Sequence, residues 1–440
     1  MNVSDTFSSY CRSIHLASTD SYDVTFSEIC KTLERHYYED DADNSHLLYV
    51  GSVGRGTAVD GTSDVDLLFV LPRDVKSRFD AYEGNKQSCL LQEVKDVLAK
   101  RYTQTTLKGD GQAVVIDFSS KHYTIDLVPA FECSDGSYDY PDSNDGGHWK
   151  RTNPLPEQRA CKTNDKQTGS NYSYCCNILR AWKDEQGFPF SGLLIDTLVD
   201  KFQKEDDDAC HASFADYPAM LGQLFKMLSS EDATQSYWYA LGSNQEISDK
   251  GHGKFVRKAS KAYELLSAVE SDDDFESAFV ELLGNVFSSC VVGSSRDKRL
   301  SSLAEKYDVR MTEQFITSVY FIDIKYNLKI DCTVTQDGFR TAYLCDMLKR
   351  HVPLLCRKDL DFRIVENDVP RPYEVYWKVR NCGDEAYRRD CIRGQIVKDA
   401  GKGHRHECTN FRGPHYVECY VIKSGICVAR DRIRVPIAEQ

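Results

Sequence analysis

The stretch from Gly51 to Leu71 constrains the fold of this chain more than any other. An apolar run at residues 47–50 is followed by glycines and then by Asp64-Val65-Asp66, which leads into a second apolar run. This order predicts a strand, a glycine-containing turn and a second strand. Side chains two positions apart on a strand point to the same face, so Asp64 and Asp66 are expected to project together.

A third carboxylate is expected to join this pair. Residues 104–108, 113–118 and 123–128 each have the composition of a strand, and short polar turns separate them. Asp126 lies inside the last of these runs. Such a hairpin would place Asp126 beside the strand that carries Asp64 and Asp66.

Three carboxylates beside a Gly51-Ser52 turn are suited to divalent ions and a nucleoside triphosphate. Hard cations such as Mg²⁺ prefer carboxylate oxygens, and a glycine lets backbone N–H groups approach phosphate oxygens. No Gly-Lys-Ser/Thr sequence ends the turn, so it is not a P-loop, and the glycine spacing does not fit a dinucleotide-binding fingerprint. The alternative is a surface turn with ordinary aspartates at the start of a strand, but a buried Asp126 would then be costly.

Bulk composition sets the broad class of the chain. Its 440 residues predict two or three domains, and 41% apolar with 28% charged residues are typical of a globular protein. No apolar run approaches the ~20 residues of a membrane span, and the N-terminus does not resemble a signal peptide, so we expect a cytoplasmic protein without membrane contact. Seventeen cysteines, an odd number, argue against a complete disulfide framework. A net charge of −13 argues against nonspecific coating of long nucleic acids.

Helices are expected on both sides of the predicted strands. Two helices are predicted over residues 3–38, with Asp20 as a possible N-cap, and another over 85–102. Residues 133–165 are rich in Asp, Gly, Asn, Pro and Ser and predict a long loop at the mouth of the site. Helices are then expected from near Asn171, over Ser191–Phe202, and three or four times more before residue 290.

The C-terminal third has a different pattern. After a polar linker near residues 293–312, residues 324–334 alternate apolar and polar positions, as one half-buried strand or two strands joined near Asn327. A helix near 340–350 and four strands are expected in the remainder, at residues 373–379, 391–397, 415–422 and 427–435. Five residues of this region are of types that ligate zinc: His404, His406, Cys408, His415 and Cys419. Their spacing matches no common zinc pattern closely. Core or loop roles are therefore the first interpretation, and metal binding is the alternative.

Gly51-Ser52, Asp64-x-Asp66 and Asp126 resemble the signature of polymerase-β-type nucleotidyltransferases. The closer resemblance, over roughly residues 20–300, is to the bacterial cGAS/DncV-like nucleotidyltransferases, the cyclic-oligonucleotide synthases of CBASS anti-phage systems. It implies an α+β fold in which a polymerase-β-like core is joined to a helical domain. It also implies that the three aspartates are catalytic and hold two Mg²⁺ ions, for which Mn²⁺ can substitute.

A second part of the resemblance lies in the predicted helices. Residues 178–183, followed by Phe190-Ser191, are similar to the family's helix that grips the triphosphate through a basic residue and a downstream serine. Arg180 takes the position where the family has Lys, and Lys183 is the competing candidate; both, with Ser191, are nucleotide-binding predictions. The alternative is two exposed cations on an amphipathic helix.

The C-terminal module resembles the AGS-C domain, a proposed sensor attached to cyclic-oligonucleotide synthases. The resemblance rests on residues 372–373, 377–383, 393–394 and 413–420. The domains expected from these observations are a catalytic domain over residues 1–165, a helical nucleotide-binding domain over 166–305 and a β-rich sensor domain over 313–440.

The function implied is synthesis of a cyclic di- or trinucleotide messenger from ATP, GTP or other nucleoside triphosphates. An unknown activator and a downstream effector, reached through the product, are the implied partners. Two alternatives stay open: a linear oligonucleotide synthase or transferase to another acceptor, and a non-catalytic nucleotide sensor that acts through the C-terminal domain.

Overall fold

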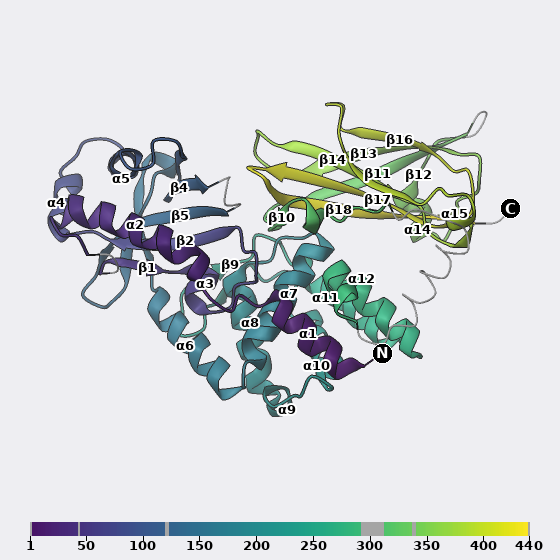
Figure 1. Ribbon diagram of the computed structural model, residues 1–440, viewed down its shortest axis with the longest axis horizontal. Helices are drawn as coiled ribbons and strands as arrows, with labels where there is room; N and C mark the ends of the chain where they lie inside the picture. Colours follow the sequence, from purple (N-terminus) through teal and green to yellow (C-terminus); the bar gives the residue numbers. More distant parts are fainter. Residues whose placement is uncertain (1, 43–44, 119–122, 292–311, 337–339, 439–440) are drawn as a thin grey trace.

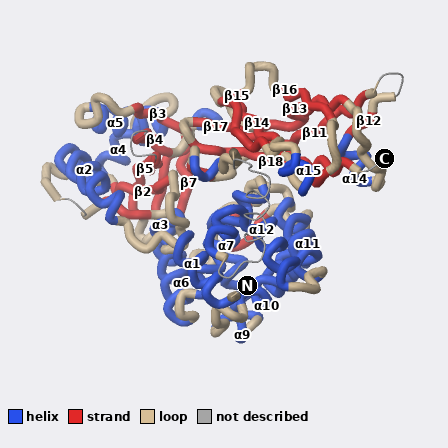
Figure 2. Tube along the Cα trace, turned by 45° about the vertical axis from the view of Figure 1, so that its right-hand side comes forward, coloured by secondary structure: helices blue, strands red, loops and turns tan. Residues whose placement is uncertain are grey.

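The computed structural model describes residues 2–42, 45–118, 123–291, 312–336 and 340–438. Figure 1 shows a sheet with helices at the upper left, a group of helices below, and a second group of strands at the upper right. Figure 2 shows helices concentrated in the lower region and strands in the upper ones. The expected α+β class, with a separate β-rich C-terminal part, is confirmed.

A seven-stranded sheet forms the first part of the chain. Its main path runs β1-β2-β5-β4-β3, and β6 and β7 extend from β5. Only β2 and β5 pair in parallel among its described strands. The strands are β1 Leu47–Tyr49, β2 Asp64–Val70, β3 Thr106–Asp110, β4 Ala113–Phe118, β5 Tyr123–Glu132, β6 Tyr138–Asp142 and β7 His148–Thr152.

The sheet buries one face against helices and turns the aspartates the other way. Val65, Leu67 and Phe69 of β2 share a core cluster with apolar side chains of α2 (Asp20–Tyr37) and α5 (Lys86–Ala99). The alternation of a strand therefore directs Asp64 and Asp66 to the opposite face. A short helix, α4 (Arg73–Asp80), follows β2.

The helical region packs around the fully buried Trp182. The N-terminal helix α1 (Val3–Ile14) belongs to it, since the rings of Phe7 and Phe287 lie 5.3 Å apart. The other elements are α6 Pro154–Gln167, α7 Asn171–Gln186, α8 Gly192–Glu205, α9 Asp207–Cys210, α10 Tyr217–Ser230, β8 Tyr237–Tyr239, β9 Glu246–Ser248, α11 Lys254–Ser267 and α12 Asp272–Cys290.

Two sheets packed face to face form the C-terminal region. One has the order β10-β18-β17-β14-β15 and the other β12-β11-β13-β16, and apolar side chains of both share one core. The elements are β10 Phe321–Ile322, β11 Leu328–Thr335, β12 Ala342–Tyr343, α14 Leu344–Lys349, β13 Asp359–Asn367, β14 Glu374–Arg380, α15 Asp384–Arg388, β15 Arg393–Lys398, β16 His404–Cys408, β17 Gly413–Lys423 and β18 Ile426–Ile437.

Several sequence-based expectations need correction. Residues 133–165 are not a long loop, since they form β6, β7 and most of α6. The turn after Gly51 is a short helix, α3 (Gly51–Arg55), and Asp20 is the first residue of α2 rather than its N-cap, which is Thr19. Strands β13 and β16 were not expected. The predicted linker near 293–312 falls almost entirely outside the described residues.

Two expectations about bulk chemistry can be compared with the structure. All seventeen cysteines are free thiols, and eight of them are buried. Among the described helices, none combines the length and hydropathy needed to cross a bilayer.

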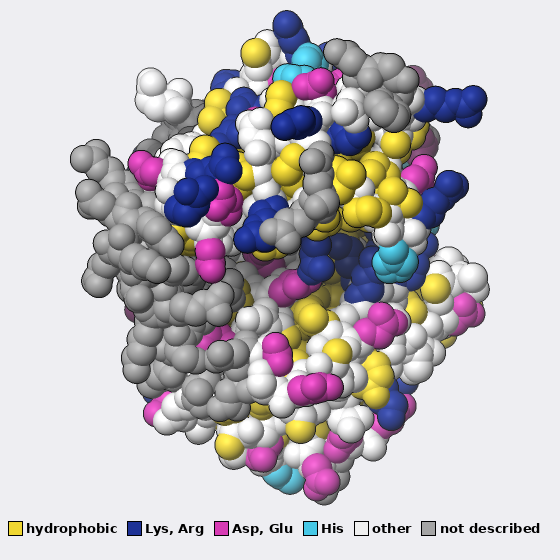
Figure 3. All heavy atoms as spheres, turned by 90° about the vertical axis from the view of Figure 1, so that its right-hand side faces the viewer, with side chains coloured by type: hydrophobic (Ala, Val, Ile, Leu, Met, Phe, Trp, Pro, Cys, Tyr) yellow, Lys and Arg dark blue, Asp and Glu magenta, His cyan; other side chains and the backbone are white. Residues whose placement is uncertain are grey.

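In Figure 3, Lys and Arg side chains gather over the upper half of the visible face and Asp and Glu over the lower half. The net charge is therefore unevenly distributed on that face.

Candidate active site

Asp64, Asp66 and Asp126 lie together on the two parallel strands. Asp66 of β2 and Asp126 of β5 are register partners, and Asp64 precedes them on the same face of β2. All three side chains are partly buried, and carboxylate oxygens of the three lie within 4.8 Å of one another. The expected placement of Asp126 beside the first two aspartates is therefore what the structure shows.

The crowding of these carboxylates shifts their protonation. The pKa of Asp66 is raised to about 7, mainly by burial and next by the negative charge of Asp64. Burial, followed by the charges of Asp64 and Asp66, raises the pKa of Asp126 to about 8. A cation among these oxygens would offset both causes, and an all-oxygen donor set suits a hard divalent ion. The residues present therefore fit a divalent metal.

Gly51 makes room for this cluster. It has φ +60, and a Cβ there would lie 1.8 Å from Oδ2 of Asp66. Its neighbour Val50 donates its backbone N–H to the carbonyl oxygen of Asp66 at 2.9 Å, which holds the start of α3 against β2. Any residue with a side chain at position 51 would push the Asp66 carboxylate out of place.

The substitution Gly51→Ala is therefore expected to lower metal binding and any turnover at this site by about 10²-fold, the size of effect that a 1 Å misplacement can have. Gly56→Ala is the matched control. Gly56 also has a left-handed φ of +73, yet a Cβ there has no described heavy atom within 4 Å. Both variants pay the backbone strain, so equal losses in Mn²⁺ affinity would contradict the proposed steric cause.

Arg180, predicted to contact phosphate, is engaged elsewhere. It is 6% exposed, and its Nη2 lies 2.8 Å from Oδ1 of Asp196 and donates to the carbonyl oxygen of Gly192 at 3.0 Å. Arg55 pairs with the other oxygen of Asp196 at 2.7 Å, and Thr57 donates to that oxygen at 2.9 Å. These contacts tie α3, α7 and α8 together, so they assign Arg180 a structural role.

Lys183 is also buried, in a cluster that reaches the C-terminal region. Its Nζ donates to Oδ1 of Asp184 at 2.5 Å, to Oδ1 of Asp323 at 3.3 Å and to the carbonyl oxygen of Ile324 at 3.3 Å. The amphipathic-helix alternative, with both cations exposed, does not describe Arg180 or Lys183. Ser191 is the N-cap residue of α8 and makes no capping bond through its side chain.

Sequence reasoning missed Lys325. This residue lies between β10 and β11, and its ammonium group donates to Oδ2 of Asp64 and lies 3.2 Å from Oδ2 of Asp323. Burial alone would lower the pKa of Lys325, but Asp323 and Asp64 raise it well above the usual range. Asp64 and Lys325 are 261 positions apart, so no local pattern could have linked them.

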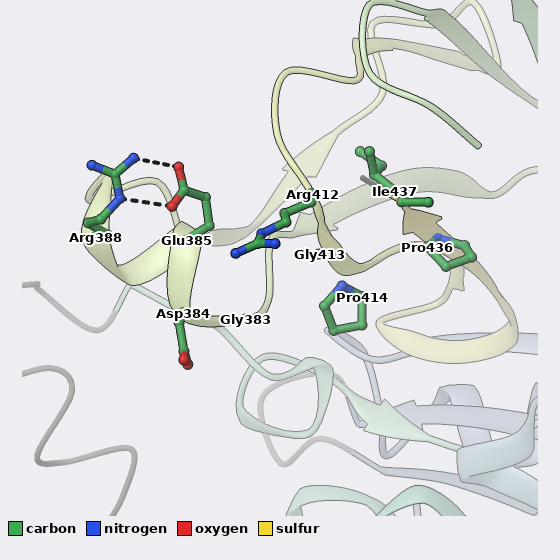
Figure 4. Close-up of a pocket in the computed structure, with 10 residues that line it drawn as sticks. Gly383, Asp384, Glu385, Arg388, Arg412, Gly413, Pro414, Pro436 and Ile437 are labelled. Carbon is green, nitrogen blue, oxygen red and sulfur yellow. Dashed lines mark hydrogen bonds and ion pairs between the residues drawn. The ribbon is translucent and has the colours of Figure 1, made fainter. Parts of the chain in front are cut away.

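A hollow of about 660 Å³ lies in the C-terminal region, with no residue in common with the aspartate cluster. Figure 4 shows Glu385 and Arg388 paired on one side of it and Pro414, Pro436 and Ile437 on the other. Gly383 and Gly413, two residues of the AGS-C resemblance, line it. The motif residues around positions 382 and 413 therefore meet in space, where Cys382 donates its N–H to Nδ1 of His415 at 3.0 Å.

Two family models match this chain. The Second Messenger Oligonucleotide or Dinucleotide Synthetase (SMODS) domain matches residues 1–165, and the Adenylyl/Guanylyl and SMODS C-terminal sensor (AGS_C) domain matches residues 310–438. A probable cyclic nucleotide synthase of Bacillus cereus (strain VD146) is 26% identical over 123 residues, or 26% of this chain. The chain covers 37% of that relative's length.

Solved structures of similar proteins include three bacterial enzymes. CdnC with ATP from E. coli MS115-1 has 17% identity and a TM-score of 0.48, covering 64% of this chain and 98% of that one. The CD-NTase CdnG with GTP from Bradyrhizobium diazoefficiens has 10% identity and a TM-score of 0.48, covering 66% and 97%. DncV from Escherichia coli in a 3′-deoxy GTP bound form has 13% identity and a TM-score of 0.44, covering 66% and 90%.

The SMODS and AGS_C matches follow one another in chain order and together span more than half of the residues. Residues 1–165 therefore form a SMODS domain and residues 310–438 an AGS_C domain, so the chain carries a second-messenger synthetase module followed by its sensor module.

Proposed function

We propose that this chain is an enzyme that uses nucleoside triphosphates and Mg²⁺ to synthesise a cyclic di- or trinucleotide second messenger. The observation that carries the proposal is the in-register pairing of Asp66 with Asp126 beside Asp64, which gathers three carboxylates in one partly buried place. The SMODS domain supports it, as does the description of the Bacillus cereus relative as a probable cyclic nucleotide synthase.

In this proposal Asp64, Asp66 and Asp126 hold a pair of Mg²⁺ ions, for which Mn²⁺ can substitute. Bound there, these ions would offset the charge that develops on the attacking and leaving oxygens of an in-line displacement. Asp126 would lie near the attacking ribose hydroxyl and would favour its deprotonation. The hydroxyl oxygen bonds to the α-phosphorus, the α–β phosphoanhydride bond breaks, and pyrophosphate leaves. A second transfer, with loss of a second pyrophosphate, would close a dinucleotide ring, and a trinucleotide ring would need a third.

The nucleotide would lie along α3 and α8. Backbone groups of Gly51 and Ser52 would contact phosphate oxygens, and Ser191 would contribute its hydroxyl. Lys183 would reach phosphate only after leaving its bonds to Asp184 and Asp323. Arg180, with its guanidinium on Asp196, would act by keeping α7 against α8.

We further place this activity in CBASS anti-phage signalling in the cytoplasm, where an activator would start synthesis and the product would reach an effector. Seventeen free thiols are suited to a reducing compartment. The domain division proposed is 1–165, 166–305 and 313–440, with α1 packed on the helical domain although it lies in the first range.

The test is incubation of the purified protein with labelled ATP, GTP, CTP and UTP and with Mg²⁺ or Mn²⁺, followed by phosphatase treatment and mass spectrometry. A phosphatase-resistant product without terminal phosphates is expected, and its mass gives the bases and the ring size. Linear, phosphatase-sensitive products would favour an oligonucleotide synthase. A protein that binds nucleotide through residues 313–440 and forms no product under any condition would favour the sensor.

A further inference from the structure

A second cluster of metal-ligating side chains lies on the outer face of the C-terminal sheet. Strand β16 presents His404, His406 and Cys408 at alternate positions, so all three point to one face. Its neighbour β13 places Asp359 opposite Cys408 and Asp361 opposite His406. Leu360 and Phe362, the alternating residues of β13, face the core, so the five polar side chains face outward.

Three of these residues already have the spacing of zinc ligands. Sγ of Cys408 lies 3.2 Å from Oδ1 of Asp359 and 3.9 Å from Nε2 of His406, which lies 3.9 Å from Oδ1 of Asp359. Bonds of about 2.0–2.3 Å to a tetrahedral zinc put ligand atoms roughly 3.3–3.6 Å apart. Movements of a few tenths of an ångström would therefore suffice to accommodate the ion.

The two neighbouring groups are committed to other partners. Asp361 accepts from Nε of Arg363 at 2.7 Å, and Nδ1 of His404 lies 3.2 Å from its other oxygen. His415 and Cys419, considered with this group from the sequence, lie apart from it: His415 bonds to Cys382 and Phe411, and Cys419 is buried in the core. Asp359, His406 and Cys408 are left as a three-ligand set.

We propose that Asp359, His406 and Cys408 bind one zinc ion, with water in the fourth position. A donor set of one thiolate, one imidazole and one carboxylate selects zinc over Mg²⁺, whereas the all-oxygen cluster of Asp64, Asp66 and Asp126 has the opposite preference. On binding, the thiol that now donates to Asp359 loses its proton to solvent. The ion would cross-link β16, the last strand of its sheet, to β13.

The test uses the full-length protein, stripped with a chelator and then titrated with Zn²⁺ against a chromophoric competitor, and separately with Co²⁺. About one tight equivalent of Zn²⁺ and a cobalt–thiolate absorbance band are expected. Cys408→Ala should abolish the band, and His406→Ala should weaken Zn²⁺ binding by more than the 10–100-fold that loss of an outer-shell partner typically costs.

Three matched variants keep the result specific. His404→Ala removes an imidazole from the same face, Cys391→Ala removes a half-buried thiol of the same region, and Asp64→Asn disrupts the other cluster. All three should retain the equivalent of Zn²⁺ and the cobalt band. No tight equivalent in the wild type, or one that survives Cys408→Ala, would overturn the proposal.

A different observation carries a second inference, which rests on the proposed function. Residues 323–325 connect β10 to β11 and cross to the catalytic cluster, where Lys325 donates to the Asp64 carboxylate. The two residues before Lys325 contact α7: Asp323 accepts a hydrogen bond from Lys183, and the N–H of Ile324 donates to Asp184 at 2.8 Å. The segment therefore puts a cation on a metal ligand and an anion on the lysine predicted to bind phosphate.

The C-terminal region is fastened on both sides of this segment. Buried Arg430 of β18 pairs with Glu185 of α7 at 2.9 Å, and Lys254 of α11 donates to Asn327 at 2.5 Å. A Cβ on Gly187, at the end of α7, would lie 2.4 Å from the carbonyl oxygen of Arg430. The contacts of Arg430 with Glu185 and of Lys254 with Asn327 therefore hold the C-terminal region on the helical region without involving the three aspartates.

We infer that residues 323–325 occupy the charges that metal and triphosphate would otherwise use, so that the C-terminal domain restrains the site until it shifts. Lys325→Met should tighten Mn²⁺ binding roughly tenfold, measured as free Mn²⁺ by electron paramagnetic resonance, and should raise product formation. Lys329→Met, which removes an exposed lysine on β11, is the control and should leave both unchanged.

Asp64→Asn separates the two ways in which this inference can fail. If Asp64→Asn weakens Mn²⁺ binding while Lys325→Met leaves it at the wild-type value or lowers it, the restraint is wrong and the metal site stands. If Asp64→Asn leaves Mn²⁺ binding unchanged both in the wild type and in the Lys325→Met protein, the proposed metal site itself is wrong.

Discussion

Asp126→Asn is expected to abolish nucleotidyl transfer while leaving the fold intact. The carboxylate is one of three that would hold the metal ions, and ions of this kind contribute several kcal/mol to the transition state, so a loss of about 10³-fold or more in kcat is expected. The variant also removes a charge from a crowded cluster in which burial and two neighbouring aspartates raise the pKa of Asp126 to about 8. Its Tm should therefore equal or exceed that of the wild type.

Product formation from nucleoside triphosphates with Mg²⁺, and a thermal melt of the same preparation, are the measurements. Asp110→Asn is the matched control. Asp110 is an exposed aspartate on β3 whose charge also acts on Asp126, but it lies outside the cluster. Its activity should stay near that of the wild type. An Asp126→Asn protein that still makes product would remove the basis of the assignment.

Asp196→Ala is expected to cause the largest loss of stability. This carboxylate is fully buried and neutralises both Arg55 and Arg180, so its removal leaves two buried cations without their partner. Breaking a buried pair in this way costs about 3–5 kcal/mol. A corresponding drop in the urea midpoint is expected. Lys204→Met removes an exposed lysine that pairs with Asp200 on the same helix, and Asp200 keeps its hydrogen bond from Asn164 at 2.7 Å, so this variant should cost less than about 1 kcal/mol.

The same contact predicts how stability depends on pH. Burial would raise the pKa of Asp196, but Arg180 and Arg55 outweigh it and lower the pKa below the ordinary value. A group with a lowered pKa in the folded state contributes stability above its unfolded pKa of about 3.9 and loses it as the pH falls through the folded value. The wild type should therefore lose more stability below pH 4 than Asp196→Ala. Equal acid sensitivity in the two proteins would contradict the assigned role of the pair.

The parts of the site that the sequence predicted are those set by local rules. The period of a strand was enough to predict that Asp64 and Asp66 share a face, and the succession of strands β3, β4 and β5 was enough to predict Asp126 beside them. The pairing of Arg180 with Asp196 could not be predicted, because helix position alone does not say whether a cation meets phosphate or a buried carboxylate on the next helix. The register of β16 with β13, which brings together the proposed zinc ligands, is likewise a long-range property.

The incorrect loop at 133–165 has a different cause. Turn-forming residues between positions 133 and 147 outweighed the tyrosines of β6, and the charged sequence of β7 lacks a strand's usual apolar alternation. One start signal for α6 was present, since Pro154 stands at its first helical position, where its missing N–H is tolerated.

Helix α1 packs against a part of the helical region that is synthesised much later. Phe287, whose ring contacts those of Phe7 and Tyr10, is synthesised about 280 positions after Phe7. At about 5–20 residues per second, tens of seconds separate the two events. Until Phe287 is made, α1 lacks these ring contacts, so part of its apolar side stays open to chaperones during synthesis.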